Sequence, residues 1–182
     1  MIPTITLNNG VKIPAIGYGV FRMKDPAECE EAVVQAIQSG YQEKQCMEVH
    51  LMKKVVEFLN ANPVQYLATV GRDGKAKCRP FMFAGELDGK LWFCTNNQKD
   101  VYKDLQANPN IEISVSSPEY AWLRLHGKAV FENNMAAKEM CIANPIVKGQ
   151  YGEATNPIFE VFYLEDAHGI IADFSGNPPY EF

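Results

Sequence analysis

The sequence predicts a mainly β protein, an antiparallel barrel or sandwich with a few flanking helices. Most of the chain after residue 63 consists of short, closely spaced segments rich in β-branched and aromatic residues, with turn residues between them. Only a few segments carry apolar residues at helical intervals. The length of 182 residues suffices for one sizeable core and a small appendage, and 47% hydrophobic with 21% charged residues is typical of a soluble globular protein.

Charge, apolar runs and cysteines narrow the class of protein. The net charge of −5 argues against a nucleic-acid partner, which usually requires a basic excess. We expect no membrane partner, because no apolar run is long enough to cross a bilayer and no signal peptide opens the sequence. The five cysteines are odd in number and form no CxxC pair, which favours a reducing compartment and no metal site. A cytoplasmic location fits best.

The first 42 residues differ in pattern from the rest of the chain. An Asn-Asn-Gly turn at residues 8–10 lies between two short apolar segments and predicts a β-hairpin. Asp25 can cap a helix that begins at Pro26 and ends at Gly40. The expected elements are strands at 5–7 and 11–13, an apolar run at 15–21 and a helix at about 25–40.

Two stretches within residues 1–42, TITLNNGVKIPAIGYGVFRM and AECEEAVVQAIQSGYQ, resemble the opening of an aldo-keto reductase. The resemblance implies the hairpin at the barrel floor, the first strand and the first helix. The catalytic aspartate, tyrosine, lysine and histidine of that family do not follow in a matching context, and one strand and one helix cannot close an eight-stranded barrel. We therefore expect residues 1–42 to be an appended fragment without reductase activity, followed by a main domain at 43–182.

The main domain is expected to begin with an amphipathic helix. Met47, Leu51 and Val55 repeat at helical spacing, and Pro63 blocks continuation of the helix. Tight turns at 71–74 and 86–89 separate the first strands. The expected strands are 64–70, 76–83, 90–94, 111–115, 121–131, 159–164 and 169–172, with further helices at about 101–106 and 135–142.

Thr95, Asn96 and Lys99 form the first chemical signal, where an apolar strand passes into a short helix. A hydroxyl, an amide and an ammonium lie near the free backbone N–H groups of a helix start, which suits an anion such as phosphate. An ordinary helix cap with a solvated lysine explains the same residues about equally well.

Arg79 and Pro80 form the second signal, inside the otherwise apolar strand at 76–83. Proline removes a ladder donor, so this strand is expected at a sheet edge or beside a ligand. A guanidinium there can bind a phosphate in bidentate fashion. Taken alone, an edge arginine that points into water is the better explanation.

The order of these segments resembles the FMN-binding split barrel, the superfamily of pyridoxamine 5′-phosphate oxidase-like proteins. The resemblance covers residues 43 to about 174. It includes the opening helix and the stretches VQYLATVGRDGKAKCRPFMF, KLWFCTNNQKDVYKDLQANPNIEISV and WLRLHGKAVF. It implies an antiparallel split barrel and a homodimer with FMN at the subunit interface.

The resemblance also implies roles for particular residues. Arg79 and Lys99 would face the FMN phosphate, and Thr95 and Asn96 would add neutral hydrogen bonds. The backbone of Pro80, Phe81 and Met82 would border the isoalloxazine ring. Trp122 and Arg124 would come from the partner subunit, although packing explains Trp122 about as well.

Four further residues near the proposed site carry weaker expectations. His126 and Gly127 are less certain members of the site, and Gly127 can simply allow a bulge or a close approach. Cys78 and Cys94 are interpreted as small core residues.

Two classes of function follow from the resemblance. The first is an FMN-dependent oxidoreductase that reduces a small acceptor with electrons from NAD(P)H. The second is a non-catalytic or stress-related protein that binds flavin, deazaflavin or heme. No side chain identifies itself as a catalytic acid or base, and the C-terminal R-L-x-P pattern of true pyridoxamine phosphate oxidases is missing from the ending DFSGNPPYEF. The catalytic residues and the substrate therefore remain unknown at this point.

Overall fold

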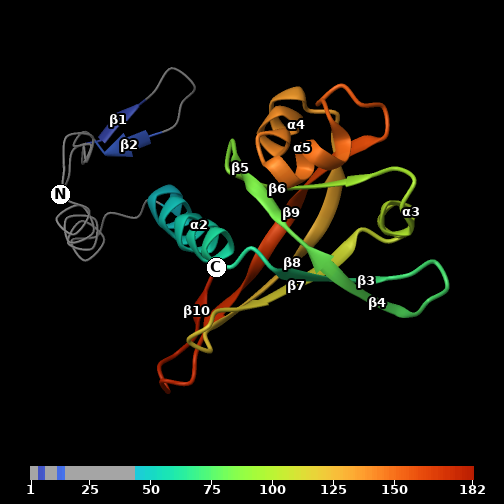
Figure 1. The fold of residues 1–182 in the computed structure, drawn as a ribbon. Helices are drawn as coiled ribbons and strands as arrows, with labels where there is room; N and C mark the ends of the chain where they lie inside the picture. Colours follow the sequence, from blue (N-terminus) through green and yellow to red (C-terminus); the bar gives the residue numbers. More distant parts are fainter. Residues whose placement is uncertain (1–3, 7–11, 15–43) are drawn as a thin grey trace. The chain divides into compact units, whose positions relative to one another are not determined.

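The computed structural model describes residues 4–6, 12–14 and 44–182 (Figure 1). Its contacts divide the chain into two units, residues 1–47 and 48–182. In the first unit, β1 (Thr4–Thr6) pairs antiparallel with β2 (Lys12–Pro14), with Ile5 opposite Ile13. The hairpin is confirmed. Its turn at 8–10, the run at 15–21 and the helix at 25–40 lie outside the described residues.

The second unit consists mainly of antiparallel strands, as predicted. The hydrogen-bonded order is β4-β3-β7-β8-β9-β6-β5, and β10 adds to β9. The strands are β3 (Gln65–Val70), β4 (Ala76–Phe81), β5 (Phe83–Leu87), β6 (Lys90–Asn96), β7 (Asn110–Ser116), β8 (Trp122–Phe131), β9 (Phe159–Ala172) and β10 (Tyr180–Glu181). The helices are α2 (Lys44–Ala61), α3 (Asp100–Ala107), α4 (Met135–Ile142) and α5 (Pro145–Tyr151).

The connection between β4 and β5 shows how the sheet is curved. These two strands are the opposite edges of the sheet, yet only Met82 separates them in sequence. One residue spans less than about 4 Å. The sheet must therefore roll until its two edges meet at this point, although no ladder pairs β4 with β5 among the described strands. The result is a rolled but unclosed sheet.

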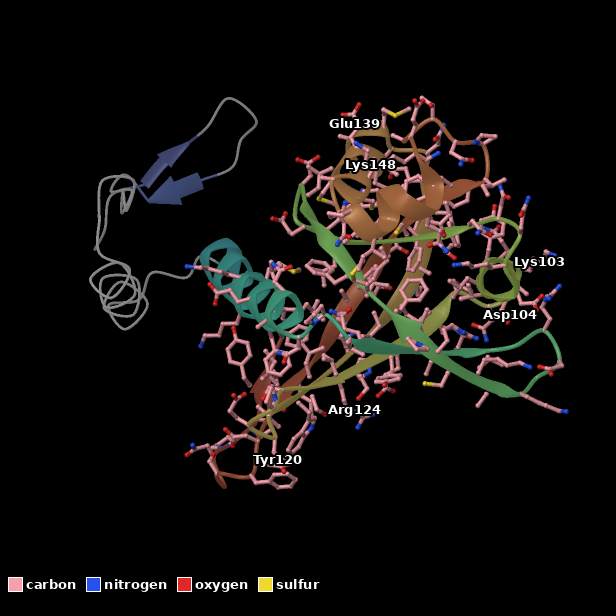
Figure 2. All side chains as sticks on the ribbon, in the orientation of Figure 1. Lys103, Asp104, Tyr120, Arg124, Glu139 and Lys148 are labelled. Carbon is pink, nitrogen blue, oxygen red and sulfur yellow. The ribbon has the colours of Figure 1, made fainter. Side chains whose placement is uncertain are left out.

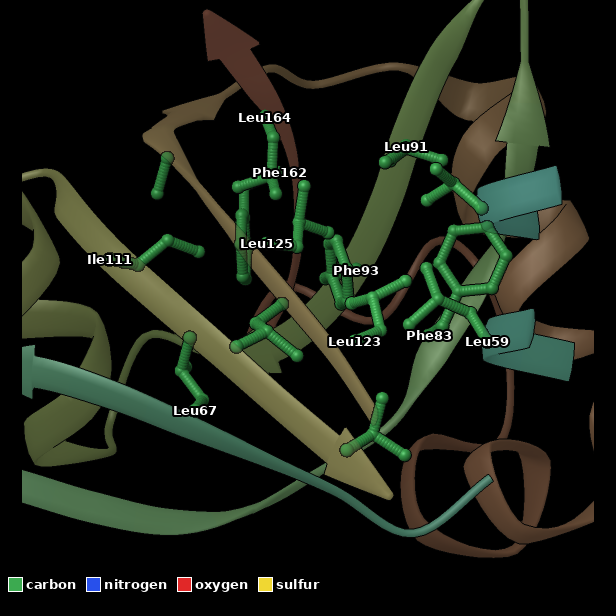
Figure 3. Close-up of a cluster of buried hydrophobic side chains, with 14 of the residues drawn as sticks. Leu59, Leu67, Phe83, Leu91, Phe93, Ile111, Leu123, Leu125, Phe162 and Leu164 are labelled. Carbon is green, nitrogen blue, oxygen red and sulfur yellow. The ribbon is translucent and has the colours of Figure 1, made fainter. Parts of the chain in front are cut away.

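Two apolar clusters fill the second unit. The larger cluster lies within the rolled sheet and includes Leu67, Phe93, Ile113, Leu125 and Phe162, each fully buried (Figure 3). The smaller cluster lies under α4 and α5 and contains Trp92, Ala137, Cys141, Val147, Tyr151, Phe159 and Val161. Strand β6 separates the two, because its side chains alternate between the faces of the sheet.

The structure differs from the expected elements at four places. The predicted strand at 76–83 is two strands, β4 and β5, divided at Met82. The predicted strands at 159–164 and 169–172 are one continuous strand, β9, which accommodates Asp166 at a φ of 52°. Helix α5 and the short β10 were not predicted. The bulge expected at Gly127 is confirmed, because the β8–β9 register shifts between His126 and Lys128.

Two properties of the described residues limit the kinds of site that need testing. No helix among them combines the length and the apolar character that a membrane crossing requires. Within the same part of the chain, no three or more His, Cys, Asp or Glu side chains gather in a way that would hold a metal ion.

Candidate functional site

Helix α3 connects the parts of the candidate site. It follows β6 directly and packs against both β6 and β3, which are far apart in the strand order. Val101 and Leu105 are buried on its inner face, and Tyr102 meets Phe131 edge-on with ring centroids 4.7 Å apart. The end of β6 and the inner face of β3 and β4 therefore converge on this helix.

Thr95, shortly before α3, has a hydroxyl that lacks a hydrogen-bond partner among the described residues. Its side chain is 2% exposed, and its hydroxyl oxygen is one of two buried polar atoms without a hydrogen-bond partner among the described residues, the other being the Tyr180 hydroxyl. A buried hydroxyl without a partner costs about 1–3 kcal/mol. Thr95 is therefore suited to hydrogen-bond a bound group.

Asn96 forms the turn that leads into α3. Its side-chain oxygen accepts hydrogen bonds from the backbone N–H groups of Gln98 and Lys99, both at 3.0 Å. These bonds fit the cap explanation, and they occupy two of the N–H groups that an anion could otherwise use.

Lys99 is exposed along its stem, but its ammonium reaches a buried neighbour. Its Nζ donates to the hydroxyl of Tyr151 at 3.4 Å, and Tyr151 is 5% exposed. The lysine is thus held against α5 and is not simply solvated. Its charge also lowers the pKa of the Cys94 thiol, although hydrogen bonding from Cys141 is the larger cause.

Arg79 lies on the inner face of the edge strand β4, opposite Leu67 of β3. Its side chain is half-buried, and Nη1 donates to the hydroxyl of Thr69 at 2.8 Å. The predicted edge position is confirmed, whereas the alternative of an arginine that points into water is wrong. The reason is alternation, which places Arg79 on the same face as the core residue Phe81.

An acidic residue that the sequence analysis did not select lies beside Arg79. Asp104 of α3 is 4% exposed and accepts hydrogen bonds from the backbone N–H and Nε of Arg72, at 3.1 and 3.0 Å. These bonds lower the pKa of Asp104, and the charge of Arg79 lowers it further. The spacing of Asp104 from Val101 and Leu105 could have placed it on the buried face of the helix.

The three residues after Arg79 lie where the two sheet edges meet. Pro80 is exposed, while Phe81 packs on Phe93 and Phe162 with centroids 6.3 and 6.0 Å away. The sulfur of Met82 accepts a hydrogen bond from the amide of Asn144 at 3.7 Å. Because the side chains of Phe81 and Met82 are engaged in packing, the backbone is what this segment can offer to a ligand.

Trp122 and Arg124 are not brought to α3 within one chain. Arg124 pairs with Glu112, and Trp122 packs on Phe174 with centroids 5.1 Å apart. The α3 contact of β8 is at Phe131, nine residues or about 30 Å along the strand from Trp122. Figure 2 accordingly shows Arg124 away from Lys103 and Asp104 of α3.

The two cysteines interpreted as core residues have different surroundings. Cys78 is exposed on the outer face of β4, so the core interpretation is wrong for it. Cys94 is half-buried and packs against the smaller apolar cluster, next to Cys141. The reason again is alternation, which points Cys78 away from the inner face that holds Arg79.

Comparison with known proteins places this arrangement in a family. The family model "Pyridoxamine 5′-phosphate oxidase" matches residues 51–168, more than half of the chain. The chain belongs to the pyridoxamine 5′-phosphate oxidase family. The matched residues include β3 to β8, helix α3 and most of β9, and hence Arg79, Thr95 and Lys99.

Solved structures agree with this family membership. A NimC/NimA family protein from Clostridium acetobutylicum is 31% identical, covers 77% of this chain and 100% of its own, and has a TM-score of 0.68. An FMN-binding, pyridoxamine 5′-phosphate oxidase-related protein from Nostoc punctiforme is 18% identical, with 75% and 85% coverage and a TM-score of 0.53. A heme-binding protein from Mycobacterium smegmatis is 17% identical, with 72% and 57% coverage and a TM-score of 0.57. The split-barrel fold of the family is thereby confirmed.

One curated relative lies outside this family. The NADPH-dependent D-xylose reductase of Candida boidinii is 49% identical over 39 residues, which are 21% of this chain. The match covers only 12% of the length of that reductase. The matched stretch of 39 residues is similar in length to residues 1–42, the fragment that resembles an aldo-keto reductase.

Proposed function

We propose that this protein is an FMN-dependent oxidoreductase that reduces a small acceptor with electrons from NAD(P)H. The observation that carries the proposal is the buried hydroxyl of Thr95, which lies near the end of β6, shortly before a helix capped by Lys99, and has no hydrogen-bond partner among the described residues. A phosphate oxygen would give this hydroxyl the acceptor that it lacks within the described residues. The FMN-binding relative from Nostoc punctiforme supports the choice of ligand.

The FMN phosphate is assigned to Arg79, Thr95 and Lys99. Among the described residues, Arg79 donates a hydrogen bond from Nη1, to Thr69, and its other guanidinium donors are unused. In the same part of the chain, the Lys99 ammonium donates to Tyr151 and keeps two further donors. Asp104 near Arg79 reduces the local positive charge, so both cations are needed to hold a dianion.

The isoalloxazine ring is assigned to the backbone of Pro80, Phe81 and Met82, with Trp122 and Arg124 of a second subunit on its other side. When bound, FMN supplies the hydride chemistry. The chain binds the phosphate, orients the ring and excludes water from it. The catalytic residues, if any side chain takes such a role, are not assigned.

A homodimer is part of this proposal. Tyr66, Val70, Ala76, Cys78 and Pro80 lie on the outer face of β3 and β4, where cross-strand partners Tyr66 and Pro80 adjoin. We call these five residues the β3–β4 outer patch. Tyr66 and Val70 are 48% and 43% exposed, and an exposed apolar sheet face of this kind suits a partner subunit. Residues 1–42 are proposed to be an appended fragment without reductase activity.

A second candidate function is binding without efficient turnover, of flavin, deazaflavin or heme. The structural similarity to the heme-binding protein of Mycobacterium smegmatis favours testing it. The visible spectrum of the purified protein, loaded with FMN and freed of excess, distinguishes these cases. Flavin bands with steady NAD(P)H oxidation support the enzyme, and flavin bands without turnover support the binding protein. A heme-like spectrum keeps the family and changes the ligand.

Charge reversal tests the phosphate assignment. Arg79→Glu combined with Lys99→Glu should abolish FMN retention, because two attractive charges become repulsive. Lys103→Glu is the matched control, because Lys103 is exposed on α3, the helix that begins after Lys99. This variant should retain FMN (Figure 2). Equilibrium dialysis measures the affinity, and circular dichroism checks the fold. Unchanged FMN affinity in the folded double variant would overturn the assignment.

A further inference from the structure

Two cysteines from distant parts of the chain meet beneath α4. Cys94 lies on β6 and Cys141 on α4, and α4 packs against β6. Both thiols border the smaller apolar cluster, near Trp92 and Phe159. Cys141 is 1% exposed, whereas Cys94 is half-buried. Cys94 is thus the less buried residue of the pair.

The two thiols have different chemical characters. Hydrogen bonding between them lowers the pKa of Cys94 and raises the pKa of Cys141, where burial acts in the same direction. The ammonium of Lys99 also favours the thiolate of Cys94. The thiolate is the reactive form of cysteine, and it reacts best near a positive charge and with some exposure. Cys94 lies near the Lys99 ammonium and is less buried than Cys141, whose thiol pKa is raised by its hydrogen bond with Cys94.

We propose that Cys94 and Cys141 form a peroxide-reactive dithiol that closes to an intramolecular disulfide. Cys94 is the attacking sulfur and Cys141 is the resolving sulfur. The pair lies on the α4 side of β6, whereas the neighbouring Thr95 faces the opposite side, and Lys99, which is also assigned to the FMN phosphate, is shared by the two sites.

The reaction balances in two steps. The Cys94 thiolate attacks one oxygen of a hydroperoxide, the O–O bond breaks, and the leaving oxygen departs as hydroxide or alkoxide and takes a proton. Cys94 is then a sulfenic acid. The sulfur of Cys141 attacks the sulfur of Cys94, the S–O bond breaks, and the hydroxyl leaves as water with the Cys141 proton. Two thiols are oxidised, and one hydroperoxide is reduced to water or to an alcohol and water.

Ordinary core packing is the alternative explanation for the pair. It predicts that neither thiol reacts faster than an exposed cysteine elsewhere in the chain. Cys78 provides that comparison within a single chain, where it is exposed on β4 and is not near the Cys94–Cys141 pair. Because the proposed dimer would cover the β3–β4 outer patch, which includes Cys78, the comparison is also made in the double variant Tyr66→Glu, Val70→Glu. The two explanations therefore predict opposite orders of reactivity.

The experiment treats the full-length, reduced protein with one equivalent of hydrogen peroxide and maps its tryptic peptides without reductant. Each cysteine in question lies on its own peptide: Cys94 on 91–99, Cys141 on 139–148 and Cys78 on 78–90. We expect peptides 91–99 and 139–148 to be joined with the loss of two hydrogens, while 78–90 remains reduced. Oxidation of 78–90 with 91–99 and 139–148 left as free thiols would overturn the proposal.

Two variants separate the roles of the sulfurs. In Cys141→Ser, Cys94 should stop at the sulfenic acid and be trapped by dimedone on peptide 91–99. In Cys94→Ser, Cys141 should stay reduced at the same dose. Cys78→Ser should form the 91–99 to 139–148 link at the wild-type rate. If Cys141 reacts equally well without Cys94, the assigned order of attack is wrong, and the wild-type mapping still decides whether the disulfide forms.

Discussion

At the scale of single residues, Asp104 shows how one carboxylate connects a helix to a turn. It accepts two hydrogen bonds from Arg72, which lies in the β3–β4 turn 32 residues earlier in the chain. Arg72 also contacts Asp100, at 2.8 Å, but the Asp100 side chain is 84% exposed whereas that of Asp104 is 5% exposed. Because the two carboxylates share the partner Arg72 and differ in burial, a substitution of Asp100 can serve as the control for a substitution of Asp104.

We predict that Asp104→Asn lowers the free energy of unfolding at pH 7 and has progressively less effect in acid. The hydrogen bonds from Arg72 lower the pKa of Asp104 in the folded protein. Its contribution is therefore present above the ordinary aspartate pKa of about 3.9 and is lost as the pH falls through the lower folded value. Urea unfolding of both proteins at pH 7 and at about pH 3 measures the difference.

Asp100→Asn is the control for this prediction. An exposed ion pair contributes little, so the unfolding free energy of Asp100→Asn should stay close to that of the wild type at either pH. A destabilisation by Asp104→Asn that is equally large at pH 3 would mean that shape rather than charge is responsible.

The residues that the sequence analysis selected stand in local motifs, whereas the residues that it missed are connected to the candidate site by long-range contacts. Arg79, Thr95 and Lys99 stand in recognisable local contexts, so the sequence indicated their chemistry. Thr69 and Asp104 were missed because their partners lie 10 and 32 residues away, at Arg79 and Arg72. A sequence pattern carries no direct signal for such pairings.

At the scale of elements, the side chain of Gln65 connects the end of α2 to the sheet through hydrogen bonds. Its side chain is fully buried, and its amide donates to the carbonyls of Leu59 and Asn62 at 3.0 and 3.2 Å. Its carbonyl accepts the backbone N–H of Phe83 at 2.9 Å. One side chain thus satisfies backbone groups of α2, of the α2–β3 loop and of β5.

We predict that Gln65→Leu lowers the free energy of unfolding by about 2–4 kcal/mol, because several buried backbone groups lose their partner at about 1–3 kcal/mol each. Urea unfolding followed by circular dichroism measures the change. Gln150→Leu is the control, since Gln150 is exposed on α5, and it should change the free energy by less than about 0.5 kcal/mol. Equal effects of the two substitutions would show that the buried hydrogen bonds are not what stabilises this junction.

Most elements were predictable because their apolar periodicity is local, and the exceptions have specific causes. Helix α5 was not predicted; it begins at Pro145, where Asn144 accepts a hydrogen bond from the backbone N–H of Ile146. The polar residues around Asp166 lie outside the predicted strands at 159–164 and 169–172. They remain in one strand because Lys128 and Glu165 still pair across the bulge at Gly127. Tertiary pairing decides such cases.

At the scale of the whole molecule, the two faces of the sheet at β3 and β4 carry different kinds of residue. The inner face presents Arg79 and Thr69 toward α3, and the outer face carries the β3–β4 outer patch. A subunit packed on that patch would lie close to Pro80 and Met82, where the ring of FMN is proposed to bind. Dimerisation and FMN binding should therefore be coupled.

We predict that Tyr66→Glu combined with Val70→Glu converts the proposed dimer to a monomer and weakens FMN binding by about tenfold or more. Two carboxylates placed on an apolar interface must be desolvated without partners, which opposes association, whereas the monomer tolerates them because both positions are partly exposed. Analytical ultracentrifugation gives the mass, and equilibrium dialysis gives the FMN affinity. Ile146→Glu is the control, because Ile146 is 73% exposed on α5, outside the patch, and should leave the mass and the affinity unchanged. A double variant that stays dimeric would place the interface elsewhere, and a monomer with wild-type FMN affinity would show that one chain completes the pocket by itself.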